Sequence, residues 1–234
     1  IKLGRVNLEI SATDDPAHAG TKILKTGGSV AVSSLLRRCA QEGLGGLEFL
    51  TGIPGSIGGV AVMNAGTHLG EAKDALRSVE IIPLSGEGAG TRKKFSRDEL
   101  KYQYRKNLFL PAGCVVWQTE WQVRAEDPAQ VKAKIDETLA RRKSTQPIDY
   151  PSCGSVFKNP KSSGMSAWQV VDKLGLRGHQ IGDAQFAEKH SNFIINLDRA
   201  KAADVRALIE LAKSRAQSEL GITLEEEVMY VGRF

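Results

Sequence analysis

Glycine is unusually dense between residues 43 and 66, where the chain reads GLGGLEFLTGIPGSIGGVAVMNAG. Glycine adopts positive φ without strain and lets another surface come close to the backbone. Successive free N–H groups in such a loop can also surround an anion. The spacing matches neither a P-loop nor a G-x-G-x-x-G dinucleotide motif. The segment therefore predicts either tight internal packing or a loop that contacts a ligand.

Hydrophobic patterning before this segment predicts strands and then a helix. Residues 1–27 alternate apolar and polar side chains around a polar turn at 11–20, which indicates short strands. The apolar positions are Ile1, Leu3, Val6, Leu8, Ile10, Ile23 and Leu24. Ser29 is expected to cap a helix that ends at Gly43. Its apolar stripe is Val32, Leu35, Leu36, Cys39 and Ala40.

After the glycine segment the pattern changes to strands and then to a long helix. Three strands are predicted, at 76–84, 91–96 and 114–123. Asp127 followed by Pro128 predicts a helix start, because a capping side chain precedes a proline in the first turn. The apolar face of this helix continues with Val131, Ile135 and Leu139.

A stretch with two prolines and no periodicity, STQPIDYPSCG at 144–154, reads as a linker. It predicts two domains, 1–143 and 144–234. The second is expected to hold helices at 166–175 and 201–220, strands around 178–197 and a final strand over 222–234. The stripe of the long helix is Val205, Leu208, Ile209, Ala212, Ala216 and Leu220, and Gly221 ends it.

Charge and cysteine usage restrict the classes of partner. The net charge is +5, but Lys and Arg are dispersed and aromatic residues make up only 6%, so a nucleic-acid surface is not expected. No apolar run approaches the ~20 residues that span a membrane, and no signal peptide is evident. The three cysteines lack metal-ligand or CxxC spacing, which favours a reducing cytoplasm and no bound metal. Because the chain begins with Ile1, we expect it to be part of a longer product.

Several polar residues could carry chemistry, and each also has a structural interpretation. Ser155, in YPSCGSVFKNP, could be catalytic or could belong to a turn. Arg105, in YQYRKN, could bind a carboxylate or phosphate, or pair with a surface acid. His190 could be structural. In a final strand, Glu225 and Glu227 would share one face and Glu226 would lie on the other.

In combination, these motifs resemble one family. GLEFLTGIPGSIGGVAVMNAG, YQYR, QP, GSVFKNP, KHSNFIIN and LEEEV occur in the order and at the separations found in the UDP-N-acetylenolpyruvoylglucosamine reductases (MurB) of bacterial cell-wall synthesis. The resemblance runs from about Leu24 to Gly232. It implies an α+β fold, with an N-terminally incomplete FAD-binding domain of the PCMH/MurB-like type and a C-terminal α+β substrate-binding domain. The family's flavin lies at the junction of these domains.

The resemblance also implies a reaction and its residues. NADPH reduces bound FAD, and hydride then passes to the enolpyruvyl group of UDP-N-acetylglucosamine enolpyruvate, giving UDP-N-acetylmuramate. Ser155 would deliver the proton, Arg105 would pair with the substrate carboxylate, and Glu227 would assist. Tyr104, Lys158 and Asn159 would bind substrate with Arg105. The residues that would line the flavin are Gly52, Ile53, Pro54, Gly55, Ser56, Gly58, Gly59 and Asn64.

The chain resembles the short type of the family, because it has no room for a tyrosine-bearing insertion between Ser155 and KHSNF. It departs from the family in four places. The family's first flavin-cradling segment has no counterpart, and Met229 replaces an arginine of many short-type members. Lys106 and Asn107 follow the arginine motif where the family usually has an Asp- or Glu-type residue and then Ser, and Cys153 replaces a small residue. A cytoplasmic monomer is expected. The alternatives are a flavin-free protein that binds a UDP-sugar or nucleotide without catalysis and, less favoured by the motifs, a flavin oxidase of the same superfamily.

Overall fold

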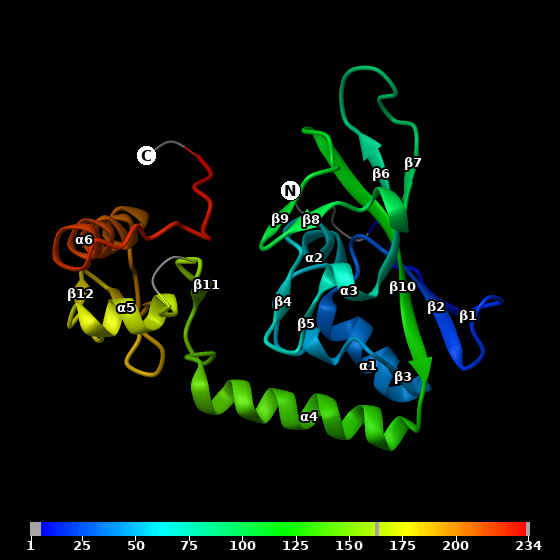
Figure 1. Ribbon diagram of the computed structural model, residues 1–234, viewed down its shortest axis with the longest axis horizontal. Coiled ribbons are helices and arrows are strands. Elements are labelled where there is room, and N and C mark those ends of the chain that lie inside the picture. Colours follow the sequence, from blue (N-terminus) through cyan, green and yellow to red (C-terminus); the bar gives the residue numbers. More distant parts are fainter. Residues whose placement is uncertain (1–5, 162–163, 233–234) are drawn as a thin grey trace. The chain divides into compact units, whose positions relative to one another are not determined.

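The chain forms two compact units, Ile1–Ala140 and Arg141–Phe234. The computed structural model (Figure 1) describes residues 6–161 and 164–232. The expected strand positions Ile1 and Leu3 lie outside the described residues. The predicted domain boundary at 143–144 falls within the last turn of helix α4 (Pro128–Thr145).

The first unit is built on an antiparallel sheet in the order β1-β2-β10-β6-β7, with β3 paired to β10. The three strands predicted between residues 76 and 124 are confirmed as β6, β7 and β10. The strands of this sheet are β1 (Ile10–Asp14), β2 (Thr21–Gly27), β3 (Leu44–Gly45), β6 (Leu76–Pro83), β7 (Lys93–Ser96) and β10 (Cys114–Ala125). Two short hairpins complete the strands of this unit: β4 (Gly66–Thr67) with β5 (Gly70–Glu71), and β8 (Tyr102–Gln103) with β9 (Lys106–Asn107).

The core of this unit contains a polar cluster where β2 faces β10. Thr26 lies opposite Thr119 in the ladder, and their hydroxyl oxygens are 2.8 Å apart. Trp121 donates its indole N–H to the Thr119 hydroxyl at 2.7 Å. All three side chains are buried, so these bonds satisfy polar groups that would otherwise be desolvated without a partner.

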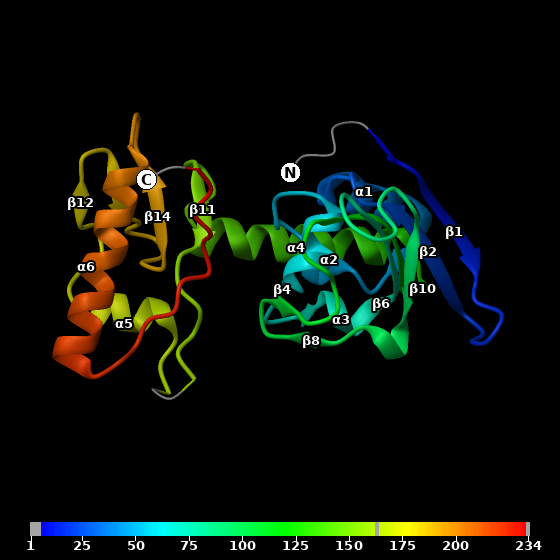
Figure 2. The same cartoon turned by 90° about the horizontal axis from the view of Figure 1, so that it is seen from above.

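The first helix, α1 (Val32–Glu42), begins later than predicted. Its N-cap is Ala31, which is held extended by a bridge to Ser56 of the glycine segment. The predicted cap Ser29 is wrong, because its hydroxyl is buried and has no hydrogen-bond partner among the described residues. The predicted end is confirmed, since Gly43 caps the helix with φ 64°. The predicted stripe also packs inward, with α1 and α2 (Ile57–Met63) on one face of the sheet (Figure 2).

The first hairpin differs from the sequence prediction. Ser11–Asp14, expected in a turn, belong to β1, and the described residues 6–9 are not in a strand. The actual turn is fixed by the carboxylate of Asp15, which accepts the backbone N–H of Ala17 at 3.0 Å and lies 3.0 Å from His18 Nδ1. Arg77 Nη2 of β6 lies 3.7 Å from the same carboxylate. The turn is therefore set by one buried acid rather than by the apolar alternation.

Helix α4 starts as predicted, with the Asp127 carboxylate accepting the N–H of Ala129 at 2.7 Å. Val131 is buried and Ile135 is partly buried against the core of the first unit. Among the described residues, no helix combines the length and apolarity needed to cross a membrane. A short helix, α3 (Ala72–Ala75), follows β5 in the same unit.

The second unit has an antiparallel sheet in the order β11-β14-β13-β12, with helices packed on it. Its elements are β11 (Ser152–Ser155), α5 (Ala167–Lys173), β12 (Gln180–Ile181), β13 (Ala184–Phe186), β14 (Phe193–Asn196) and α6 (Ala202–Leu220). The two predicted helices are confirmed. The stripe of α6 packs against Phe186 and Ile194 of the sheet and Val170 of α5 in one apolar core. Gly221 ends α6 with φ 67°.

Candidate functional site

The glycine segment passes between the sheet and solvent, and its inner side is packed against backbone. The N–H of Gly58 donates to Gly28 O at 2.9 Å, and the N–H of Ile57 donates to Val30 O at 2.9 Å. A Cβ added at Gly58 would lie 3.0 Å from Gly28 O. Gly58 is therefore explained by close packing of two chain segments.

The outer side of the same segment is open. Gly52, Pro54, Gly55 and Gly59 are exposed. Positive φ explains Gly52 and Gly55, at 74° and 112°. Gly59 is different, because it lies in the first turn of α2 and a Cβ added there would meet only Ser56 Oγ, at 3.8 Å. Neither the backbone nor protein packing requires glycine at that position, so it fits the close approach of a ligand.

The remaining predicted flavin residues of this region are engaged within the protein. Ser56 caps α2, its hydroxyl accepting the N–H of Gly59 at 3.5 Å, and Ile53 packs against the core. Asn64 is fully buried and ends α2 with φ 46°. Its amide donates to Glu71 Oε2 at 3.0 Å and to Gln103 O at 3.1 Å, and it accepts the N–H of Lys73 at 2.9 Å. The contact of Asn64 with flavin stays a prediction, and its observed bonds fix the end of α2 to hairpin β8–β9.

Arg105 lies at the tip of the β8–β9 hairpin in the left-handed region, with φ 54°. Its side chain is 16% exposed. Nη2 donates to Gly66 O at 2.9 Å, and Nη1 lies 3.7 Å from Glu71 Oε1. The guanidinium also lies 4.7 Å from the ring centre of Tyr104, a cation–π arrangement. The predicted pair Tyr104 and Arg105 is thus held as one unit.

Glu71 is a residue that the sequence analysis missed. Its carboxylate accepts a hydrogen bond from Asn64 Nδ2 and lies near Arg105, and its Oε2 is 2.9 Å from Lys73 Nζ. The pKa of Lys73 is raised, first by its hydrogen bond to Glu71. Glu71 therefore links the end of α2 to the predicted substrate-binding arginine. No spacing signal marks it in the sequence, because its partners come from separate segments.

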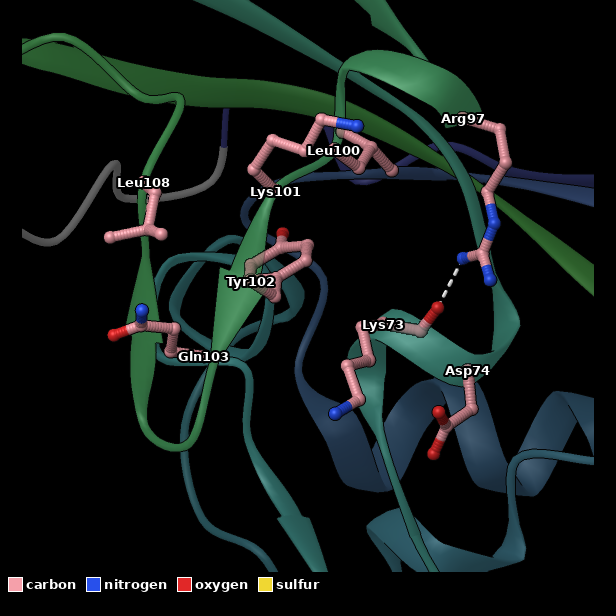
Figure 3. A pocket seen from close by; sticks show the side chains of 8 residues that line it. All are labelled: Lys73, Asp74, Arg97, Leu100, Lys101, Tyr102, Gln103 and Leu108. Atoms are coloured by element: carbon pink, nitrogen blue, oxygen red, sulfur yellow. Dashed lines mark hydrogen bonds between the residues drawn. The ribbon is translucent and has the colours of Figure 1, made fainter.

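A pocket of about 560 Å³ lies on the flank of the same hairpin (Figure 3). Its lining residues are Lys73, Asp74, Arg97, Leu100, Lys101, Tyr102, Gln103 and Leu108. Arg97 donates to the carbonyls of Lys73 and Leu76, and the first of these bonds is drawn in the figure. The lining includes neither Arg105 nor the glycine segment. The pocket therefore does not contain the residues that were predicted to bind substrate or flavin.

In the second unit, Ser155 ends β11 beside a left-handed Gly154 with φ 82°. Ser155 pairs in register with Phe193 of β14 and is partly buried. The predicted neighbour Cys153 is exposed and unpaired, as expected for a free thiol. The next residue, Val156, is buried and donates its N–H to Asn192 O at 2.8 Å.

The predicted final strand over 222–234 is wrong in extent. The tail forms only one isolated bridge, Phe157 with Glu226, flanked by bonds from Glu227 N to Val156 O and from Lys158 N to Glu225 O, both 2.8 Å. The tail has no further partner strand among the described residues, so the pattern of alternating faces does not extend. Met229 is 75% exposed.

Several side chains around this bridge make ion pairs or hydrogen bonds. Lys158 Nζ pairs with Glu225, and Glu226 Oε1 accepts from Lys213 Nζ at 2.6 Å. Asn159 Oδ1 accepts the N–H of Ala167 at the start of α5, at 2.9 Å. The bridge brings Ser155, Lys158 and Glu227 onto one short stretch of the second unit.

His190 lies among aromatic side chains, which agrees with the structural role considered for it from the sequence. Its ring lies 5.0 Å from the ring of Phe193 and 6.4 Å from that of Trp168, both edge to face. Burial lowers the pKa of His190, which favours the neutral imidazole. Within residues 6–161 and 164–232, no three His, Cys, Asp or Glu side chains gather as metal ligands.

Comparison with known proteins gives matches over nearly the whole chain. A family model described as "UDP-N-acetylenolpyruvoylglucosamine reductase, C-terminal domain" matches residues 146–231. The chain is 37% identical over 226 residues to the UDP-N-acetylenolpyruvoylglucosamine reductase of Agathobacter rectalis, covering 97% of this chain and 70% of that relative. It is 42% identical over 220 residues to the enzyme of the same name from Anaeromyxobacter sp. strain K, covering 94% and 64%.

A solved structure matches as well. The UDP-N-acetylenolpyruvylglucosamine reductase (MurB) of Thermus caldophilus superposes with a TM-score of 0.75 at 37% identity, over 88% of this chain and 72% of that one. The chain spans about two thirds of the length of the curated relatives that it matches, as the first two relatives show with 70% and 64%.

Proposed function

Since this chain belongs to the UDP-N-acetylenolpyruvoylglucosamine reductase family, we propose that it reduces UDP-N-acetylglucosamine enolpyruvate to UDP-N-acetylmuramate. The family uses FAD and NADPH and supplies a precursor of peptidoglycan. The resemblance inferred from the motifs is confirmed by these relatives. The predicted mixed fold is supported by the structural match to the Thermus caldophilus enzyme.

The outer side of the glycine segment would hold the flavin. Gly59 supports this assignment, because its lack of a side chain is required neither by φ nor by protein packing. A helical glycine costs about 1 kcal/mol relative to alanine, so a position that keeps it without an internal reason fits contact with a ligand. FAD, when bound, supplies hydride transfer from NADPH to the substrate.

Arg105 would bind and orient the substrate carboxylate. A planar guanidinium matches a carboxylate in geometry and charge, and it stabilises negative charge that develops beside that carboxylate during reduction. Its bond to Gly66 O and its approach to Glu71 limit its rotamers, so less ordering is needed when substrate binds. Tyr104 supports the guanidinium through its ring.

Ser155 would donate a proton to the carbon next to the carboxylate. A serine hydroxyl is a weak acid in water, but an enolate is basic enough to take its proton when the two are held together. Glu227 would assist, and it is fixed to the same stretch through its N–H bond to Val156 O. Lys158 and Asn159 would bind the UDP-sugar, where a lysine offers a point charge for phosphate.

We also propose a monomer in the cytoplasm. All three cysteines are free thiols, which suits a reducing compartment. The UDP-sugar and NADPH are both polar phosphate-bearing molecules, and no apolar face is needed to bind them.

The test is an absorption titration of the full chain with FAD, then NADPH, then substrate. We expect flavin bands near ~450 nm that bleach with NADPH and return with substrate. Gly59→Leu should weaken FAD binding at least tenfold without lowering the melting temperature, since a Cβ added there meets only Ser56 Oγ, at 3.8 Å, and leucine favours a helix more than glycine does. A chain that binds a UDP-sugar by calorimetry but holds no flavin at saturating FAD would overturn the proposal and favour a non-catalytic binder.

A further inference from the structure

One buried amide side chain in the second unit faces the backbone next to Ser155. Asn192, the residue before β14, is 4% exposed. Its Oδ1 accepts the N–H of Phe157 at 3.0 Å, and its Nδ2 donates to Phe157 O at 2.9 Å. One side chain thus satisfies both backbone groups of a residue that is itself 1% exposed.

These two side-chain bonds take over where the backbone pairing of β11 with β14 ends. The β11–β14 ladder ends with Ser155 opposite Phe193, and the register is irregular before it. Beyond that point the carbonyl of Asn192 accepts from Val156, and the Asn192 amide takes the place of the next backbone partner at Phe157. Asparagine is suited to this, because its amide offers a donor and an acceptor at peptide-like spacing.

The opposite edge of the same stretch is held by the tail. Val156 O accepts from Glu227 N, and Lys158 N donates to Glu225 O. The Asn192 side chain therefore lies on one edge of the stretch and the tail on the other. A shift of Phe157 would move Ser155, Lys158 and Glu227 together.

We propose that Asn192 is a positioning residue for the reduction, acting through the backbone of Phe157 to fix Ser155 and the docking position of Glu227. The catalytic consequence rests on the proposed function. The two hydrogen bonds between Asn192 and the Phe157 backbone, here called the clamp, are a property of the fold. Misplacement of a reacting group by about 1 Å can cost on the order of 100-fold in rate, so a clamp next to a proton donor is expected to matter for turnover more than for binding.

The first measurement needs no variant. In the full wild-type chain, the amide of Phe157 should exchange with deuterium as slowly as that of Ala187, a buried residue whose N–H donates to Phe193 O at 2.8 Å. Rapid exchange at Phe157, with Ala187 protected, would show that the two Asn192 bonds do not form and would overturn the proposal.

The second measurement compares Asn192→Asp with Asn196→Ala. Aspartate keeps the acceptor but loses the donor. Asn196 is a matched control, because it also bonds a backbone N–H, that of Ala200 at 2.9 Å, but away from Ser155. With FAD, NADPH and substrate, Asn192→Asp should lower kcat at least tenfold, change KM less than threefold and raise the solvent deuterium isotope effect. Asn196→Ala should leave all three unchanged.

The outcomes separate the clamp from the proposed function. Equal kcat in Asn192→Asp and wild type would overturn the positioning role. A parallel loss in Asn196→Ala would also overturn it, by showing a general effect on folding. A wild-type chain that retains flavin but does not reduce the substrate would refute the proposed function and with it the catalytic role, while exchange at Phe157 would still decide whether the clamp exists.

Discussion

Replacing Asn64 with alanine tests whether this residue is structural or serves only to contact flavin. Its buried amide makes three hydrogen bonds, to Glu71, Gln103 and Lys73, and its backbone is left-handed. If these bonds hold α2 to the β8–β9 hairpin, Asn64→Ala will destabilise the first unit even without flavin. If the residue only contacts flavin, the stability of the flavin-free chain will not change.

The size of the effect follows from the bonds and the backbone. A buried hydrogen bond contributes about 1 kcal/mol net, and one to a charged group about 1.5–3 kcal/mol. Alanine in the left-handed region costs about 1–2 kcal/mol more. Because water will reach part of the released groups, we expect Asn64→Ala to lower the free energy of unfolding by about 3 kcal/mol. Asn64→Gly should lose about 1 kcal/mol less, since glycine tolerates positive φ.

Urea unfolding followed by tryptophan fluorescence measures this loss. In a Trp168→Phe background, the remaining Trp117 and Trp121 both lie in the first unit, so the signal reports that unit alone. The midpoint should fall while the slope of the transition stays constant. A loss below about 1 kcal/mol for Asn64→Ala, or equal losses for the alanine and glycine variants, would refute the reasoning.

Three further results are expected. Ser155→Ala should leave NADPH oxidation by the bound flavin nearly intact and slow the substrate half-reaction by about 100-fold or more in stopped flow, and equal loss in both halves would contradict its role as proton donor. The pKa of Asp15 lies below its ordinary 3.8, first because the N–H of Ala17 donates to it. The ionised carboxylate therefore stabilises the fold above pH ~4, and this contribution is lost as the pH falls through the folded-state pKa. The melting temperature of Asp15→Asn should be lower than that of wild type at neutral pH, and the two should converge towards pH ~2. A difference in melting temperature that stays constant with pH would count against this. Burial raises the pKa of Cys39 to about 12, and desolvation also raises the pKa of Cys153. The two thiols differ in exposure, since Cys39 is 1% exposed and Cys153 is exposed, so a thiol reagent at about pH 8 should label Cys153 slowly in the native chain and Cys39 only after unfolding, as mapped by mass spectrometry.

The sequence predicted those elements whose pattern is local. The stripe of α6, the Asp127–Pro128 helix start and the glycine ends at Gly43 and Gly221 were confirmed because periodicity and capping act within a few residues. The Ser29 cap was wrong because a bridge from Ser56, distant in sequence, holds the chain extended to Ala31. Tertiary pairing determined that boundary, and local propensity did not.

The candidate site could be predicted only in part, for the same reason. Arg105 and Ser155 stand in motifs that can be recognised, and their roles remain predictions. Glu71 and Asn192 could not be singled out, because their importance lies in backbone and side-chain partners that only the fold brings close. The predicted tail strand failed because a single bridge to Phe157 replaced a full ladder.

That bridge sets an order for biosynthesis. Phe157 belongs to an early part of the second unit and Glu226 to its last part, so the ribosome must add almost the whole unit before the two can meet. Joining segments so far apart closes a long loop, which tends to occur late in folding. A nascent chain that stops short of Glu227 would contain Ser155 and Lys158 but would lack the strand edge that holds them. Interrupted synthesis is therefore expected to yield a chain without the proposed catalytic arrangement, rather than a weakly active one.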